Sequence, residues 1–67
     1  MSIAKVIEVI AESDQSFDDA VQKGVTQASS TVKNVQSVWV KEMKGLVENG
    51  KVTTFRVAMK VTFVVES

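Results

Sequence analysis

The sequence has no cysteine, no histidine, no proline and no tyrosine, and it has one tryptophan, Trp39. Without cysteine there are no disulfide bonds to stabilise the fold and no indication of a redox compartment. Without histidine the chain lacks the commonest metal ligand and the usual proton carrier at neutral pH. A chain of 67 residues buries only about 60% of its unfolded surface, so its own core is marginal. Self-association is therefore the expected source of further stability.

An excess of charge of either sign is also absent, because eight acidic residues balance eight basic ones. This balance argues against a broad nucleic-acid-binding surface and against a membrane-surface footprint. No segment approaches the roughly 20 apolar residues that a membrane span needs. The opening MSIAKVIEVIAES is interrupted by Lys5 and Glu8 and lacks the pattern of a signal peptide. We therefore expect a soluble, cytoplasmic protein.

Apolar residues at spacings of three and four predict a helix over about residues 16–33. Ser16 followed by Asp19 resembles a capping box at its start. Asn34 tolerates the left-handed conformation that often ends a helix. Gly24 lies within the apolar stripe, where it costs about 1 kcal/mol relative to alanine. Its presence predicts a close approach of the helix to a sheet.

Three segments rich in valine and other strand-forming residues predict strands over residues 4–11, 35–47 and 51–66. Asn49-Gly50 between the last two predicts a type I′ hairpin turn, because both residues accept positive φ angles. The chain, residues 1–67, is then a single domain with the element order β-α-β-β. The third strand is expected between the first and second strands, antiparallel to both.

Alternation along the third strand assigns its residues to two sheet faces. We expect the single helix to cover the face of Phe55, Val57, Met59, Val61, Phe63 and Val65. Val38 and Val40 would join this face, which sends Ser37, Trp39, Lys41 and Met43 to the opposite one. That uncovered face is too apolar for plain solvent, so it predicts an interface with other copies of the chain.

The sequence contains no nucleophile–base pair, no metal-ligand spacing and no glycine-rich phosphate loop, so we expect a non-catalytic protein without a metal site of its own. Asp14, Asp18 and Asp19 lack the spacing of a calcium-binding loop and are expected to be cap and surface residues. Gly45 predicts a bulge in the second strand. Arg56 alternates with Lys60 on the uncovered face. Either a salt bridge to a neighbouring subunit or a contact to an anionic ligand would explain Arg56 and Lys60.

The segments AKVIEVIAESDQSFDDAV, ASSTVKNVQSVWV and GKVTTFRVAMKVTFVVE resemble the dodecin family along essentially the whole chain. The resemblance implies an α+β fold, a three-stranded antiparallel sheet wrapped on one helix, that assembles into a hollow dodecamer. It also implies that flavins (riboflavin, FMN or FAD) are held at subunit contacts, for storage or to quench photochemistry.

The resemblance implies three candidate cofactor-binding residues in this chain: Ser37, Trp39 and Arg56. In flavin-binding members a tryptophan follows the Asn-Val or Asn-Ile that begins the second strand and stacks on the flavin ring. Ser37 occupies that position here, and Trp39 follows two residues later on the same strand face. A glutamine of the third strand hydrogen-bonds the ring edge in those members, and Arg56 occupies that position.

Two functional classes follow from these substitutions. In one, the protein is a flavin shell in which Trp39 stacks on the ring and Arg56 pairs with a phosphate or a ring carbonyl. In the other, it is a dodecin-like assembly that binds no flavin and holds another small anion or a metal ion, or is mainly structural. We expect Trp39 to pack at a subunit contact, with stacking on a ligand as the alternative role.

Overall fold

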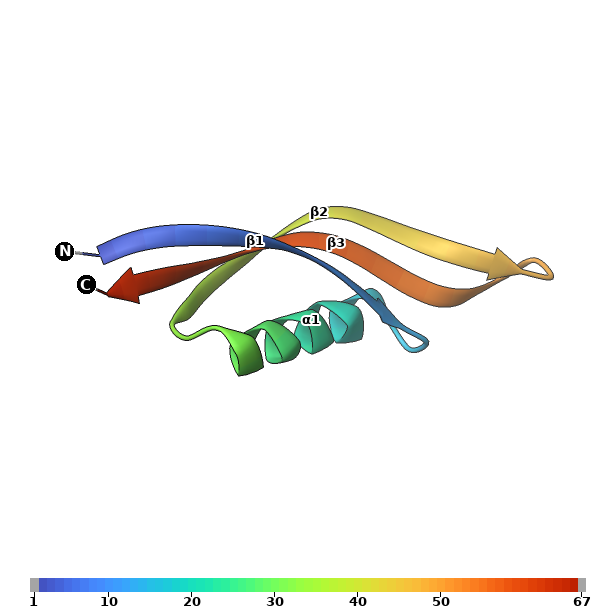
Figure 1. Ribbon diagram of the computed structural model, residues 1–67. Coiled ribbons are helices and arrows are strands. Elements are labelled where there is room, and N and C mark those ends of the chain that lie inside the picture. The colour runs from blue at the N-terminus through green and yellow to red at the C-terminus, as the bar shows by residue number, and fades with distance from the viewer. Residues whose placement is uncertain (1, 67) are drawn as a thin grey trace.

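The computed structural model describes residues 2–66. Its elements are β1 (Ser2–Ser13), α1 (Phe17–Thr31), β2 (Val35–Glu48) and β3 (Lys51–Glu66) (Figure 1). The predicted β-α-β-β order is confirmed. β3 lies in the middle of the sheet, antiparallel to both neighbours, in the order β1-β3-β2. β1 is longer than predicted because β3 supplies a partner for every residue of β1.

The start of α1 is fixed by hydroxyl groups. The Ser16 hydroxyl accepts a hydrogen bond from the backbone N–H of Asp19 at 2.9 Å, which confirms the cap. The second hydrogen bond of a capping box, from the Ser16 backbone N–H to the Asp19 side chain, does not form. The Asp19 carboxylate instead accepts a hydrogen bond from the Ser13 hydroxyl at 2.6 Å. Ser13 Oγ in turn accepts from the backbone N–H groups of Gln15 and Ser16. The Ser13 hydroxyl and the Lys23 ammonium, 3.0 Å from Asp19, lower the pKa of the Asp19 carboxyl.

The end of α1 comes two residues earlier than predicted. The backbone N–H of Val32 closes the last turn by donating to the Ala28 carbonyl at 2.9 Å. Asn34 then adopts a φ of 63°, the left-handed conformation expected of it. Its side-chain amide also donates to the Val64 carbonyl at 3.3 Å, which ties the loop to β3.

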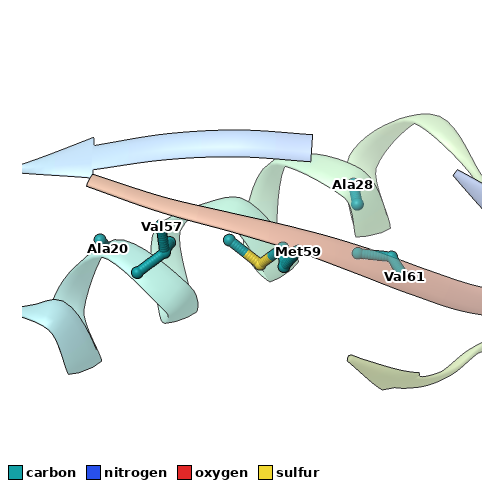
Figure 2. Close-up of a cluster of buried hydrophobic side chains, with 5 residues drawn as sticks. All are labelled: Ala20, Ala28, Val57, Met59 and Val61. Carbon is teal, nitrogen blue, oxygen red and sulfur yellow. The ribbon is translucent and has the colours of Figure 1, made fainter. Parts of the chain in front are cut away.

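The core lies between α1 and the sheet face that it covers (Figure 2). The buried apolar residues are Ala20, Ala28, Val57, Met59 and Val61. Small residues on the helix allow a close approach: a Cβ placed on Gly24 would lie 2.6 Å from Met59 Cε and 3.2 Å from Ala11 Cβ. The close approach predicted from Gly24 is therefore confirmed. Phe17 and Phe55 meet edge to face beside this core, with ring centroids 5.0 Å apart.

The β2–β3 hairpin extends past α1 and ends in the predicted turn (Figure 1). Asn49 has a φ of 52° and Gly50 a φ of 76°, so both central residues take the positive values that a type I′ turn requires. β2 is irregular, with register shifts at Val35/Ser37, Val40/Glu42 and Leu46/Val47. The last of these adjoins Gly45, where the sequence predicted a bulge.

The register shift at Val40/Glu42 shows that the predicted sheet face of Met43 is wrong. It leaves Lys41 without a partner of its own on β3, so the strand alternation changes phase after Val40. Met43 consequently pairs with Val57, on the face that α1 covers, instead of sharing a face with Trp39. It is nevertheless 56% exposed, because α1 packs on β1 and β3 more than on β2.

Candidate functional site

The candidate site is the sheet face opposite α1, called the open face from here on. Val38 and Val40 pack against the core on the helix side, whereas Trp39 between them is 64% exposed. Directly paired residues of antiparallel strands lie on the same face. The central positions of the open face are therefore Val6, Glu8, Ile10 and Glu12 on β1, Ser37, Trp39, Glu42 and Lys44 on β2, and Arg56, Ala58, Lys60 and Thr62 on β3.

Ser37 and Trp39 lie side by side on this face, as the sequence predicted. Ser37 pairs with Thr62 and Trp39 with Lys60. The Lys60 ammonium lies 5.6 Å from the centroid of the Trp39 ring, a cation–π contact worth about 0.5–1 kcal/mol at an exposed site. The flat indole is thus held beside a hydroxyl and a cation.

Acidic residues of β1 accompany the cations of the open face. Glu8 pairs with Lys60 in the sheet register, and its carboxylate lies 3.9 Å from the ammonium of Lys41. Glu12 pairs with Arg56, and the guanidinium Nε of Arg56 donates a hydrogen bond to Glu12 Oε2. Arg56 therefore has an ionic partner within its own chain.

Arg56 is separated from Trp39 within one subunit. Trp39 stands opposite Lys60, four residues from Arg56 along β3, which at about 3.3 Å per residue amounts to about 13 Å. On β2, the residue opposite Arg56 is Lys44. Of the three positions named by the resemblance, the fold brings Ser37 and Trp39 together and places Arg56 farther along the sheet.

A small cavity of about 130 Å³ lies next to Arg56 on the open face. It is lined by Ile10, Glu42, Lys44, Arg56 and Ala58. Sequence reasoning missed Glu12, Glu42 and Lys44 as neighbours of Arg56. The bulge at Lys41 brings Glu42 and Lys44 to this face, and the β1–β3 register brings Glu12.

A larger cavity of about 350 Å³ lies where α1 ends, lined by residues 32–34 and 63–66. It contains none of the three positions named by the resemblance. Within residues 2–66, the fold gathers no group of three acidic side chains that would hold a metal ion. No helix of the same range is long and apolar enough to cross a membrane.

Comparisons with known proteins agree with this fold. The family model described as Dodecin matches residues 3–66. Among solved structures, a dodecin from Streptomyces coelicolor is 32% identical, with a TM-score of 0.92 over 98% of this chain and 94% of that one. A dodecin from Streptomyces davaonensis is 27% identical, with a TM-score of 0.92 over 98% and 97% of the two chains.

A third solved structure, a calcium dodecin from Mycobacterium tuberculosis described as calcium-chelating, is 28% identical. Its TM-score is 0.81, and the match covers 91% of this chain and 87% of that one. A search of curated proteins gave no match.

Proposed function

The chain belongs to the dodecin family, and on this premise we propose that it forms a non-catalytic homo-oligomeric shell, a dodecamer, that binds a flavin between subunits. The observation that carries the proposal is the open face itself. A tryptophan that is 64% exposed lies there among other exposed apolar side chains, beside cations and hydroxyl groups.

Self-association follows from the distribution of apolar surface. On the open face Val6 is 54% exposed and Ile10 70% exposed, and both lie on the same face as Trp39. The fully buried core is small by comparison and is supported by one helix. Exposed apolar surface of this extent on so small a domain marks a protein–protein interface. A second copy of the chain is the partner that the family relationship supports.

Ligand binding follows from the surroundings of Trp39. A planar ring stacked on the indole would gain about 0.5–1.5 kcal/mol beyond its buried area. The Ser37 hydroxyl lies on the same sheet face as Trp39, and the Lys60 ammonium lies over one side of the indole. A ring stacked on the indole therefore uses its other side or displaces Lys60, and in either case has these two polar groups nearby. Arg56 lies too far from Trp39 to contact the same end of the ring in one subunit. It reaches either the far end of an extended ligand or a ligand held by a neighbouring subunit.

The second candidate function is a shell that binds no flavin and holds another small anion or a metal ion, or is mainly structural. Ser37 at the position where flavin-binding members have their stacking tryptophan favours this candidate. A metal ion such as calcium would need acidic residues from more than one subunit, because no suitable group forms within residues 2–66 of one chain.

The test is titration of the purified oligomer with riboflavin and with FMN, followed by quenching of flavin fluorescence, with the mass checked by light scattering. The variants are Trp39→Ala and the matched control Trp39→Phe, which keeps an aromatic ring. We expect a closed oligomer, strong quenching with the native chain and with Trp39→Phe, and loss of quenching with an intact Trp39→Ala oligomer. A monomer contradicts the shell. An oligomer that binds neither flavin contradicts the proposal that the ligand is a flavin, and it favours the second candidate function.

A further inference from the structure

Arg56 lies between groups of opposite charge on the open face. In the sheet register Glu12 stands on one side of it and Lys44 on the other. Two cations directly opposite each other on a sheet repel, which disfavours the Lys44–Arg56 pair unless an anion lies nearby. Guanidinium groups bind phosphate and carboxylate oxygens through two parallel hydrogen bonds. Lys44 and Arg56 alone would therefore form an anion-binding pair.

Glu12 already supplies a carboxylate to this pair. It accepts the hydrogen bond from Arg56 Nε, which leaves the donors on the two terminal guanidinium nitrogens. Glu42 also lines the cavity beside Arg56, so Glu12, Glu42, Lys44 and Arg56 together carry no net charge. An incoming phosphate would be repelled by Glu12, whereas an uncharged carbonyl oxygen meets terminal N–H donors without that repulsion.

We propose that Glu12 is a specificity-determining residue: as the built-in counter-ion of Arg56, it excludes phosphate-like anions from the Lys44–Arg56 pair and leaves the guanidinium to uncharged acceptors. Applied to flavins, which rests on the function proposed above, the site takes the uncharged ring edge and gains little from a phosphate at this position. The side chains of Glu12 and Arg56 are 45% and 39% exposed in the single chain, so neither charge is enclosed by its own subunit.

The first arm of the test uses inorganic phosphate. The native oligomer, Glu12→Gln and Glu48→Gln are titrated by calorimetry at constant ionic strength. Glutamine keeps an oxygen that accepts the hydrogen bond from Arg56 and removes only the charge, so Glu12→Gln should remain folded and assembled. Glu48→Gln removes the same charge near the hairpin turn and controls for the net charge of the subunit.

We expect Glu12→Gln to bind phosphate about tenfold more tightly than the native chain or more, since the repulsion by the Glu12 carboxylate is removed while the terminal guanidinium donors stay available. Glu48→Gln should bind like the native chain, and the double variant Glu12→Gln/Arg56→Gln should lose the gain. Equal phosphate affinities of the native chain and Glu12→Gln would overturn the proposal. So would an equal gain in Glu48→Gln, because the effect would then reflect net charge.

The second arm compares FMN with riboflavin on the same variants and separates the two proposals. We expect Glu12→Gln to shift the ratio of the two dissociation constants toward FMN by about tenfold. If neither flavin binds any variant while phosphate binds Glu12→Gln more tightly, the flavin function fails and the role of Glu12 stands. If both flavins bind but the ratio and the phosphate affinity do not change, the flavin function stands and the role of Glu12 fails.

Discussion

Substitution of Gly24 probes the contact between α1 and the sheet on which the open face depends. A Cβ at this position would lie 2.6 Å from Met59 Cε, 3.3 Å from Met59 Sδ and 3.2 Å from Ala11 Cβ. The methionine terminus can rotate away, whereas Ala11 Cβ is fixed to the backbone of β1. An alanine therefore fits only if Met59 moves within a core where it is 1% exposed.

The geometry sets the magnitudes. Gly24→Ala gains about 1 kcal/mol of helix propensity and displaces Met59 toward an unfavourable rotamer at a cost of about 0.5–1.5 kcal/mol. We therefore expect a free energy of unfolding within about 1 kcal/mol of the native value. Gly24→Leu adds a larger side chain where there is no space, so overpacking should lower the free energy of unfolding by about 1–3 kcal/mol.

A double-mutant cycle identifies Met59 as the cause. Met59→Ala alone should cost about 2–5 kcal/mol, because it leaves a cavity in the core. In Gly24→Leu/Met59→Ala the leucine can enter that space, so the double variant should be more stable than the sum of the single changes predicts, by at least about 1 kcal/mol. Gln27→Leu, at an exposed position of the same helix, controls for the change in side-chain type.

The assay is urea unfolding followed by circular dichroism, at one fixed protomer concentration because association contributes to apparent stability. Oligomer mass is measured for each variant beside the unfolding curve. Two results would refute the reasoning: a Gly24→Leu midpoint equal to that of the native chain, or additivity of the Gly24 and Met59 changes. Either would mean that Gly24 does not face Met59.

Two further predictions concern the ends of the elements. The lowered pKa of Asp19 means that its stabilising contribution is complete above the ordinary value of 3.8 and is lost as pH falls through the lowered pKa. The unfolding midpoint should thus become less sensitive to acid in Asp19→Asn and in Ser13→Ala. The control variant Asp18→Asn should keep the acid sensitivity of the native chain. Equal acid sensitivity in all three variants would contradict the role of Asp19. Gly50→Ala should lower the free energy of unfolding by about 1–2 kcal/mol, because an L-residue is strained at its φ of 76° although nothing lies within 4 Å of the added Cβ. An unchanged unfolding midpoint would show that the turn relaxes.

The fold was predictable where local chemistry decides it. Alternation along β3, the Asn49-Gly50 turn and the Ser16 cap each depend on neighbouring residues, and each is confirmed. The face of Met43 was not predictable, because a bulge at Lys41 carries no glycine or other local signal. The alternation therefore appears continuous in the sequence although the register shifts.

The candidate site was predictable only in part, because pairs distant in sequence build it. Ser37 and Trp39 lie two residues apart on one strand, so strand geometry alone places them on one face. Glu12 and Arg56 are 44 residues apart and meet only through the β1–β3 register. A one-residue slip of that register would turn Glu12 to the other face, which is why the charge pattern alone did not identify the pair.

The charge pairs of the open face also bear on how it can be buried. Desolvating an unpaired charge costs several kcal/mol, whereas a hydrogen-bonded ion pair recovers much of that cost. Arg56 with Glu12 and Lys41 with Glu8 are paired within one chain before any contact with a second subunit. In the proposed shell, a second copy would therefore meet a face whose apolar side chains remain exposed while these cations are already compensated. Assembly can then be driven by apolar burial around Trp39, and the charge pairs need not exchange partners between subunits.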